Sequence, residues 1–557
     1  MRHSLLRFPV FPGAAPHVAS ASPGAGGRAS GAGTIAPDAI EPLFAAIRAA
    51  RVGGAFWAPP GVLGSATRIV RARTIDDLDG AGSAGADDTL WLLPARLARR
   101  GDVRRRLGAA RIGADAVDPW SLLDGRAELV AHGDDEWVAI AVIAGCPVRL
   151  LSAGRFGTPG DDRAALAARV ARDLEEASDP DPFTGEAVDP AALVAWLGDL
   201  RRSFAANQGI VAACGFSWWK RAEIARFLST PRHALRFFWS ERRAIAYAAR
   251  VGGAIAVWPS RVSAGLAAAA AARGVALVRV EDGFVRSVGL GSNLVPPSSI
   301  TIDRLGIHYD PTRPSDLERL LAEGVFADDL LVRAERLRAT ILSAGISKYG
   351  GDAVHVFPER VAGKRLVLVA GQVEDDQSVL LGGGGLTSNL EVLRRARLLE
   401  PDAEIWFRPH PDVDAGHRRG VVRDADALQH ADRIVRGGTM ARLLDLVDAV
   451  HVLTSLTGFE ALLRGRAVTC HGVPFYAGWG LTRDLMAVPE RRHRRLALAE
   501  LVAAVLIVYP RYLDPLTGLP CPPEVLIARM AAGNARNRLA WVTKLKQVQG
   551  RMTMGWS

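Results

Sequence analysis

The stretch HVLTSLTGFEALLRGRAVTCHGVPFYAGWG, residues 451–480, decides the fold of this 557-residue chain. Its pattern predicts a buried strand, a small polar turn, a helix, a second short strand and a loop of aromatic residues and glycines. Hydroxyl groups and backbone N–H groups at the start of such a helix form a cradle of the size of a phosphate group. Together with RPHPD at Arg408–Asp412, the stretch predicts an α/β unit with a nucleotide-sugar site.

Strand-like and helix-like segments alternate along most of the chain. Apolar runs such as VALVRV (Val275–Val280) and RLVLVA (Arg365–Ala370) are separated by helical segments. Strands separated by helices predict a parallel sheet that binds ligands at the carboxyl ends of its strands. The expected fold class is therefore α/β, with twin Rossmann-like domains that face a cleft.

Composition and pattern divide the chain into five expected parts. Gly, Ala, Ser and Pro dominate residues 13–36, which is typical of a disordered segment. The expected parts are a disordered N-terminal segment over 1–37, a degenerate Rossmann-like half-module over 38–204, a first Rossmann-like domain over 205–355, a second Rossmann-like domain with closing helices over 356–545, and a tail over 546–557.

The half-module is predicted from an internal repeat. WLLPAR from Trp91 resembles WFRPHP from Trp406, and the stretch from Leu122 resembles the stretch from Leu443. DPFTGEAVDP at Asp181 also resembles DPLTGLPCPP, which lies further along the chain. A repeat of this length indicates that the N-terminal region is a second copy of the C-terminal half-module.

The N-terminal copy lacks the polar residues of the C-terminal copy. Ala95 lies where His410 sits, and an anionic residue at a phosphate cradle would repel the ligand. We therefore interpret this copy as structural and inactive. The other two replacements are Asp135 for Ser455 and Ile140 for Glu460.

Charge and cysteine content narrow the class of protein. The formal net charge of +10 favours an anionic partner, which can be nucleic acid, an anionic lipid or a small anionic substrate. The four cysteines lie far apart, which argues against a zinc module or a disulfide framework. No apolar stretch approaches the ~20 residues needed to span a bilayer. Pro9 and Pro12 interrupt the apolar N-terminal run, so we expect a protein that is soluble or attached to a membrane surface.

Two motifs are candidates for nucleotide binding. His410 follows a short strand, where a rigid imidazole can donate to a phosphate oxygen or can make only a structural hydrogen bond. Thr454 and Ser455 precede a helix, so they can bind an anion or simply cap the helix. Glu460, one turn further on, can accept from ribose hydroxyls or serve as an ordinary first-turn acid.

Acids at a strand end form the candidate catalytic motif. Glu281 and Asp282 close the strand VALVRVED, and carboxylates at such an edge suit nucleophilic or acid–base work on a sugar. Arg286 and Ser287 follow in the same loop. The alternative interpretation is a strand-to-loop turn with a solvated pair of acids.

Three further stretches face the predicted cleft. Gln372 and the acids that follow it have no His or Cys nearby, so a metal site is not expected there. Tyr476 and Trp479 can stack on a base or a sugar, or can belong to a packed loop. Lys220, in GFSWWKR, can meet an anionic sugar or lipid, or can lie on a solvated face.

The chain resembles the capsule polysaccharide synthesis and export proteins of Gram-negative bacteria, of the KpsC/LipB type. The similarity covers about residues 205–545 and rests on GFSWWKR, VEDGFVRSVGLGSNLVPPSS, GIHYDPTRPSDLE, GQVEDD, RPHPDV, TSLTGFEALLRG, PFYAGWGLT and YPRYLDPLTGLP. Members of this family often carry two complete modules. This chain has one complete module, preceded by the degenerate half-copy.

The resemblance implies a GT-B-like fold and a retaining β-Kdo glycosyltransferase that uses CMP-Kdo. Its acceptor would be Kdo linked to (lyso)phosphatidylglycerol at the cytoplasmic face of the inner membrane, where other capsule proteins are possible partners. No cofactor, metal or nucleic acid is expected. The alternatives are a GT-B transferase with another nucleotide sugar, or a non-catalytic scaffold of the capsule export machinery.

The resemblance also implies roles for individual residues. Asp282 is expected to be the carboxylate nucleophile, and Glu281 is either the active acid or a base. Arg286 and Lys220 would pair with the carboxylate of Kdo. The expected nucleotide-binding residues are His410, Pro411, Ser455, Thr454, Glu460 and Gln372, and the remaining expected substrate-binding residues are Ser287, Tyr476 and Trp479.

Overall fold

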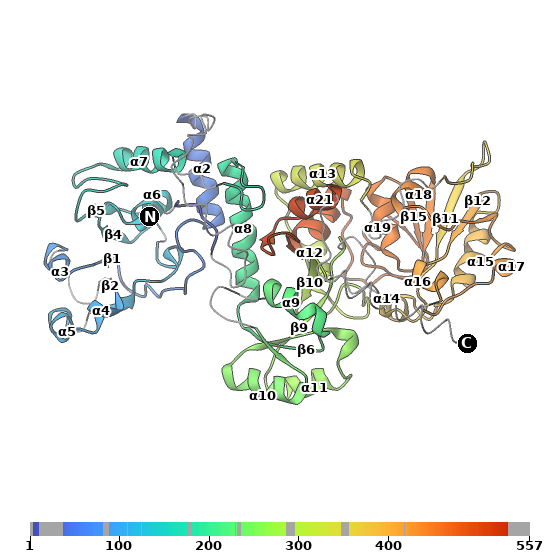
Figure 1. The fold of residues 1–557 in the computed structure, drawn as a ribbon, viewed down its shortest axis with the longest axis horizontal. Helices are drawn as coiled ribbons and strands as arrows, with labels where there is room; N and C mark the ends of the chain where they lie inside the picture. Colours follow the sequence, from blue (N-terminus) through green and yellow to red (C-terminus); the bar gives the residue numbers. More distant parts are fainter. Residues whose placement is uncertain are drawn as a thin grey trace, which may run out of the picture. The chain divides into compact units, whose positions relative to one another are not determined.

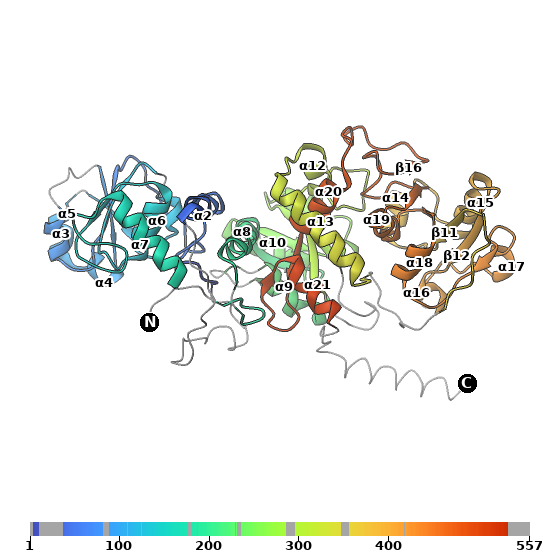
Figure 2. The same ribbon diagram turned by 90° about the horizontal axis from the view of Figure 1, so that it is seen from above.

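The computed structural model describes residues 4–9, 37–81, 88–108, 110–123, 125–176, 180–186, 188–228, 230, 235–285, 296–346, 356–416 and 418–532. These residues divide into two compact units near residue 208. Figures 1 and 2 show that both units consist of sheets covered by helices. Across the described ranges, no helix has the length and apolar character needed to cross a membrane.

The N-terminal unit contains one five-stranded sheet. Its order is β3-β2-β1-β4-β5, and every neighbouring pair is parallel. The almost wholly apolar helix α6 follows β4 and packs against α2 and α7. The strands are β1 Arg68–Arg71, β2 Thr89–Leu93, β3 Arg111–Ala114, β4 Glu128–Ala131 and β5 Val148–Leu150; the main helices are α2 Pro37–Ala50, α6 Glu136–Ala144, α7 Arg163–Glu176 and α8 Pro190–Asn207.

Residues 4–9 contradict the expectation that all of 1–37 is disordered. Leu5 and Leu6 are buried in the core of the N-terminal unit. Arg7 makes an ion pair with Glu136 at 2.7 Å, so the segment is held by apolar burial and by charge. Pro9 ends the described segment, and residues 10–36 lie outside the described part.

The first sheet of the second unit has the order β18-β17-β10-β9-β8-β6-β7. Strands β6 to β9 pair in parallel, as the sequence predicts, whereas β10 is antiparallel to β9. The helices α9 Arg221–Leu228, α10 Glu241–Val251 and α11 Leu266–Ala271 lie along this part of the chain. The strands are β6 Ile210–Cys214, β7 Arg236–Phe238, β8 Ala254–Val257, β9 Leu277–Asp282, β10 Ser299–Asp303, β17 Pro510–Leu513 and β18 Pro520–Cys521.

Two strands from the end of the chain complete this first sheet. The sequence placed them in the second domain, but β17 pairs antiparallel with β10 and then with β18. An uncovered β10 would expose its unpaired backbone groups, and β17 satisfies them. Helix α21, Pro523–Ala531, then packs against α13, Asp328–Ser343, which also belongs to the connection between the two sheets.

The second sheet has the order β13-β12-β11-β14-β15-β16, and all its neighbours are parallel. Its first five strands follow the same order as the N-terminal sheet, β3-β2-β1-β4-β5. The strands are β11 Leu366–Ala370, β12 Glu404–Arg408, β13 Arg433–Ile434, β14 Ala449–Val452, β15 Ala467–Cys470 and β16 Arg483–Asp484; the helices include α14 Gln377–Gly382, α15 Asn389–Leu399, α16 Pro411–Asp414, α18 Met440–Leu446 and α19 Leu456–Leu463.

One apolar core joins the two parts of the second unit. It contains Phe284 after β9, Leu321 of α12 (Asp316–Glu323), Trp406 of β12 and Phe459 of α19. Two Rossmann-like sheets that share a core in this way form the α/β, GT-B-like fold that the sequence predicts. The active site must therefore be sought where the carboxyl edges of the two sheets approach.

Candidate active site

The turn between β14 and α19 is called the cradle below, because the start of a helix is a candidate site for an anion. Ser455 is the N-cap of α19, and its hydroxyl oxygen accepts a hydrogen bond from the backbone N–H of Thr457 at 3.2 Å. The same hydroxyl donates to Oγ1 of Thr457 at 3.1 Å. Because the first N–H groups of a helix have no partner within it, this end carries positive charge toward the sheet edge.

Gln372 fixes the shape of that cradle. Its Oε1 accepts from the backbone N–H of Thr454 at 2.7 Å, and its Nε2 donates to Oγ1 of Thr454 at 3.1 Å. Asn389 holds the Gln372 backbone at both its N–H and its carbonyl, each at 2.8 Å. Gln372 and Thr454, two of the predicted nucleotide-binding residues, are thus hydrogen-bonded to each other. Together they position the turn that precedes Ser455.

His410 lies at the neighbouring strand end with a defined tautomer. It caps α16, and its Nδ1 accepts from the backbone N–H of Asp412 at 3.2 Å. A neutral imidazole that accepts at Nδ1 carries its hydrogen on Nε2, so it can donate to an oxyanion. Pro411 opens the helix at a position where no N–H is needed. A Cβ on Gly371 would lie 3.3 Å from the backbone nitrogen of His410, so glycine allows this close approach.

Glu460 lies inside α19 and is buried, with 8% of its surface exposed. Its backbone carbonyl accepts from the guanidinium of Arg464 at 3.1 Å. The position is one turn beyond Ser455, on the helix whose start forms the cradle.

Tyr476 and Trp479 do not line a site, so the prediction that they bind substrate is wrong. Both side chains are fully buried. The hydroxyl of Tyr476 donates to the backbone carbonyl of Ser455, and Nε1 of Trp479 donates to the carbonyl of Phe475 at 2.9 Å. A Cβ on Gly458 would lie 2.2 Å from the Tyr476 oxygen. The packed-loop interpretation is therefore correct. The loop contacts the turn before α19 through the hydrogen bond from Tyr476 to Ser455.

The candidate carboxylates lie at the carboxyl edge of the first sheet. Asp282 ends β9, and the ammonium of Lys220 lies 3.0 Å from its Oδ1. Nζ of Lys220 also lies 3.5 Å from the ring centroid of Trp258. The sequence expected Lys220 to face a substrate carboxylate, but in the structure it holds Asp282. Glu281 accepts from the backbone N–H of Asp282 at 3.1 Å; Arg286 and Ser287 lie outside the described residues.

Aromatic contacts bring this edge and the cradle together. The ring centroid of Phe284, two residues after Asp282, lies 4.7 Å from that of Phe475 and 6.5 Å from that of Phe459. Phe459 precedes Glu460, and its ring lies 5.7 Å from that of Phe475. The three motifs EDG, TSLTGFE and FYAGWG therefore converge on one cluster of rings, although more than 150 residues separate the first from the others.

Tyr309 is a residue of this region that the sequence reasoning missed. Burial raises its pKa, and the negative charges of Glu281 and Asp376 raise the pKa further. Glu281 ends a strand of the first sheet, whereas Asp376 caps α14 beside the second sheet. Acidic side chains beside both sheets therefore raise the pKa of the same Tyr309 hydroxyl. The motif GIHYDPT, which contains Tyr309, was the available signal.

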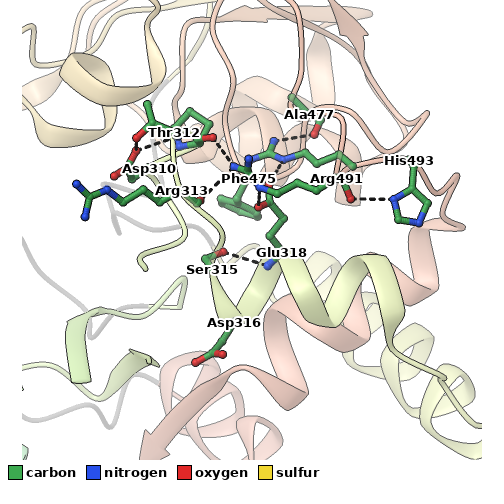
Figure 3. A network of polar contacts seen from close by, with 12 residues as sticks. Asp310, Thr312, Arg313, Ser315, Asp316, Glu318, Phe475, Ala477, Arg491 and His493 are labelled. Carbon is green, nitrogen blue, oxygen red and sulfur yellow. Dashed lines mark hydrogen bonds and ion pairs between the residues drawn. The ribbon is translucent and has the colours of Figure 1, made fainter. Parts of the chain in front are cut away.

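A buried ion pair holds the aromatic loop to the first part of the unit (Figure 3). Nε of Arg492 donates to Glu318 of α12 at 2.6 Å, and its Nη1 donates to the carbonyls of Pro474 and Ala477 at 2.7 and 2.8 Å. Arg491 binds the other oxygen of Glu318. Burial lowers the pKa of Arg492. Sequence reasoning missed this pair because it joins residues 174 positions apart.

The described residues contain no cluster of three or more His, Cys, Asp or Glu side chains with the spacing of a metal site. Candidate donors to an anion include the backbone N–H groups at the start of α19 and the imidazole of His410.

Comparison with known proteins identifies the relatives of the chain. Residues 253–362 and 358–512 match the family described as capsule polysaccharide biosynthesis protein. The capsule polysaccharide modification protein LipA of Neisseria meningitidis serogroup A is 40% identical over 337 residues, which cover 60% of this chain and 47% of LipA. The chain thus spans about half the length of this curated relative.

Two further proteins are similar over comparable lengths of the chain. The lipopolysaccharide-processing protein LpsZ of Rhizobium meliloti is 39% identical over 321 residues, which cover 57% of this chain and 72% of LpsZ. The solved structure of the β-Kdo 2,7 transferase KpsC of Thermosulfurimonas dismutans is 33% identical, with a TM-score of 0.48, and the match covers 58% of this chain and 99% of that structure. From the extent of the match to LpsZ, the chain belongs to the family of capsule polysaccharide biosynthesis proteins.

Proposed function

We propose that the chain is a retaining glycosyltransferase that transfers Kdo from CMP-Kdo to a lipid-linked Kdo acceptor in capsule biosynthesis. The observation that supports the proposal is the contact of Phe284 with Phe459 and Phe475, because Phe284 follows the end of β9 and Phe459 lies in α19. Membership of the capsule family supports the same conclusion. We further propose that the protein works at the cytoplasmic face of the inner membrane.

The cradle is the proposed site of the CMP phosphate. The N–H groups at the start of α19 and the Ser455 hydroxyl would bind its oxygens. His410 would donate from Nε2 to the phosphate oxygen as it leaves, because its Nδ1 is already an acceptor. Glu460 would accept from a ribose hydroxyl. These groups neutralise the leaving phosphate without a metal ion in the proposed mechanism.

Asp282 is the proposed nucleophile of the first step. One of its oxygens forms a bond to the anomeric carbon of Kdo while the bond from that carbon to the phosphate oxygen of CMP breaks. The Lys220 ammonium favours the ionised carboxylate before the attack. The products are CMP and an ester between Kdo and the enzyme.

The second step transfers Kdo to the acceptor. The acceptor hydroxyl attacks the same anomeric carbon, the ester bond breaks, and the Asp282 carboxylate is released. Glu281 is the proposed base that takes the hydroxyl proton, because it directly precedes Asp282 at the end of β9. Two inversions at one carbon give overall retention.

Incubation with CMP-Kdo and a synthetic Kdo-lipid tests the proposal. Mass spectrometry should find the acceptor enlarged by one Kdo, and NMR should assign a β-linkage. Asp282→Ala should lower turnover by roughly 10⁴-fold, as loss of a catalytic group does in other enzymes. Turnover that survives this substitution would remove Asp282 from the mechanism.

Calorimetry separates the proposal from its alternatives. CMP should bind the wild-type chain and bind His410→Ala more weakly. A preference for UDP would instead indicate a transferase with another donor. Absence of affinity for any nucleotide would contradict the transferase proposal and support a scaffold in the capsule machinery.

A further inference from the structure

Positive charge is concentrated in one short part of the chain. Residues 209–276 contain ten Lys and Arg residues against two Glu residues, a net charge of +8, while the whole chain carries +10. Lys220, one of the ten, is buried and paired with Asp282, so its charge does not add to that of the surface. Glu223 is buried, and Glu241 accepts from the backbone N–H and the hydroxyl of Ser263 at 2.7 and 2.6 Å.

Two exposed tryptophans lie in the same part of the chain. Trp218 is 62% exposed and Trp239 is 79% exposed, which is unusual for so large an apolar side chain. Trp218 follows β6 in a single turn of 3-10 helix, and Trp239 directly follows β7. Since β6 and β7 are paired in parallel, both tryptophans stand at the carboxyl edge of the first sheet.

Several arginines lie at the same edge of the sheet as the tryptophans. The guanidinium of Arg221 lies 3.7 Å from the ring centroid of Trp239. Arg242 and Arg243 are exposed in the first turn of α10, which begins two residues after Trp239. Arg261, also exposed, follows β8, the next strand of the sheet. The edge therefore presents two separate aromatic rings within a field of fixed positive charge.

We propose that this carboxyl edge, formed by Trp218, Trp239, Arg221, Arg242, Arg243 and Arg261, docks on an anionic lipid bilayer. Tryptophan partitions to the headgroup level of a membrane because one end of its ring system is apolar and the other is polar. Arginines next to it face the lipid phosphates. Arg221 lies directly against the Trp239 ring, whereas the buried centre of a protein interface is depleted of charged residues.

Docking at this edge also explains how a lipid-linked acceptor reaches the carboxylate. Lys220 closes the same helical turn as Trp218, and it holds Asp282 at 3.0 Å. An edge that lies on the bilayer presents Asp282 to sugars just above the headgroups. This consequence rests on the proposed transferase function, while the docking itself does not.

Vesicle flotation with the full-length chain tests the docking surface. The wild-type chain should float with mixed phosphatidylglycerol and phosphatidylcholine vesicles, stay unbound with pure phosphatidylcholine, and lose binding as salt rises. Arg242→Gln with Arg243→Gln should weaken partitioning by roughly tenfold or more, since each basic residue near the surface contributes about fivefold. Trp218→Ser with Trp239→Ser should weaken it by about tenfold.

A matched pair of arginines on another surface provides the control. Arg394→Gln with Arg395→Gln, on the exposed face of α15, should leave flotation within about twofold of wild type. Equal losses from both pairs would show a non-specific charge effect and overturn the proposal. Unchanged flotation of the tryptophan variant would also overturn it, as would binding of a protein partner at this edge in place of vesicles.

Failure of docking and failure of the transferase proposal give different results. The tryptophan variant should keep CMP affinity and turnover of a short, water-soluble Kdo acceptor, and should lose turnover only of the acceptor embedded in vesicles. Binding to vesicles by a chain without CMP affinity would retain the docking surface and remove the enzyme assignment. Loss of CMP affinity in the tryptophan variant would indicate misfolding. Flotation of the variant with Arg242→Gln and Arg243→Gln would then decide the docking proposal, and unchanged flotation of that variant would overturn it.

Discussion

The two copies of the half-module share the same order of parallel strands but differ in the polar residues at the carboxyl ends of those strands. Both place five parallel strands in the same order, and both cap the helix that follows the fourth strand. Asp135 caps α6 by accepting from the N–H of Trp137 at 3.0 Å, just as Ser455 caps α19. The two residues are thus structural equivalents, as the repeat predicts.

The two N-cap residues differ in their charge and in their side-chain partners. The Asp135 carboxylate is paired with Arg71 at 2.9 Å, and the guanidinium of Arg71 lies 4.5 Å from the ring centroid of Trp137. Its negative charge already occupies the helix start. Ser455 is neutral, so the helix dipole in the second copy is left to act on a ligand. The comparison teaches that apolar residues maintain this fold in both copies, while the cap residue sets the charge at the start of the helix.

The largest effect on stability is expected from the buried ion pair between Arg492 and Glu318, which holds the aromatic loop to α12. Glu318→Ala leaves the buried guanidinium of Arg492 without its carboxylate, and should lower the free energy of unfolding by about 3–5 kcal/mol. Chemical denaturation measures this change. Arg319→Ala, which breaks an exposed pair with Asp316 on the same helix, should cost less than about 1 kcal/mol. Similar losses for both variants would contradict a special role for the buried pair.

Replacing the N-cap residue of α19 by the residue type that caps α6 tests the comparison directly. Ser455→Asp keeps a good N-cap, so stability should change by less than about 1 kcal/mol. The new carboxylate would repel the phosphate, and CMP affinity should fall by roughly a hundredfold or more. Calorimetry and thermal denaturation measure the two effects. Retention of CMP affinity would show that the phosphate binds elsewhere.

Much of the fold follows from the sequence, because strand and helix periodicity is local. The parallel strands β6 to β9 and the start of α19 at Ser455 are examples. The return of β17 to the first sheet, and the pairing of Lys220 with Asp282, depend on contacts between distant residues that no local pattern encodes. Tyr476 was misjudged because aromatic residues beside glycines occur both in ligand-stacking loops and in packed ones.

Acid should unfold the second copy before the first. His451, in the fourth strand β14, and His471 are buried 3.0 Å apart, and burial lowers their pKa values to about 4 and about 3. The unfolded chain binds protons below about pH 6.5, whereas the folded pair does not, so stability falls as pH decreases from 6.5 toward 4. The N-terminal counterpart β4 has Leu129 and Val130 buried in its interior.

The expected loss between pH 7 and pH 5 is roughly 3–4 kcal/mol for the two histidines together. Hydrogen exchange read by mass spectrometry should show it for β14 peptides more than for β4 peptides. Replacement of both histidines by Gln should flatten the pH dependence, and His493→Gln, an exposed control, should not. An unchanged pH dependence in the double variant would assign the effect to other groups.

The smallest effect is expected from the reverse exchange. Asp135→Ser leaves Arg71 without its carboxylate, so the N-terminal unit should lose about 1–2 kcal/mol of stability. It should not gain CMP affinity, because Ala95 and Ile140 still replace the other polar residues. Denaturation and calorimetry measure both results. New CMP binding would show that the cap alone makes the site.

The most direct test of the account is a search for the sugar ester on Asp282. The chain is incubated with CMP-Kdo in the absence of acceptor, digested at low pH and analysed by tandem mass spectrometry. We predict release of CMP and a peptide that contains Asp282 with the added mass of one Kdo, absent from Asp282→Ala. Turnover with retention in Asp282→Ala, or an adduct on another residue, would contradict the account.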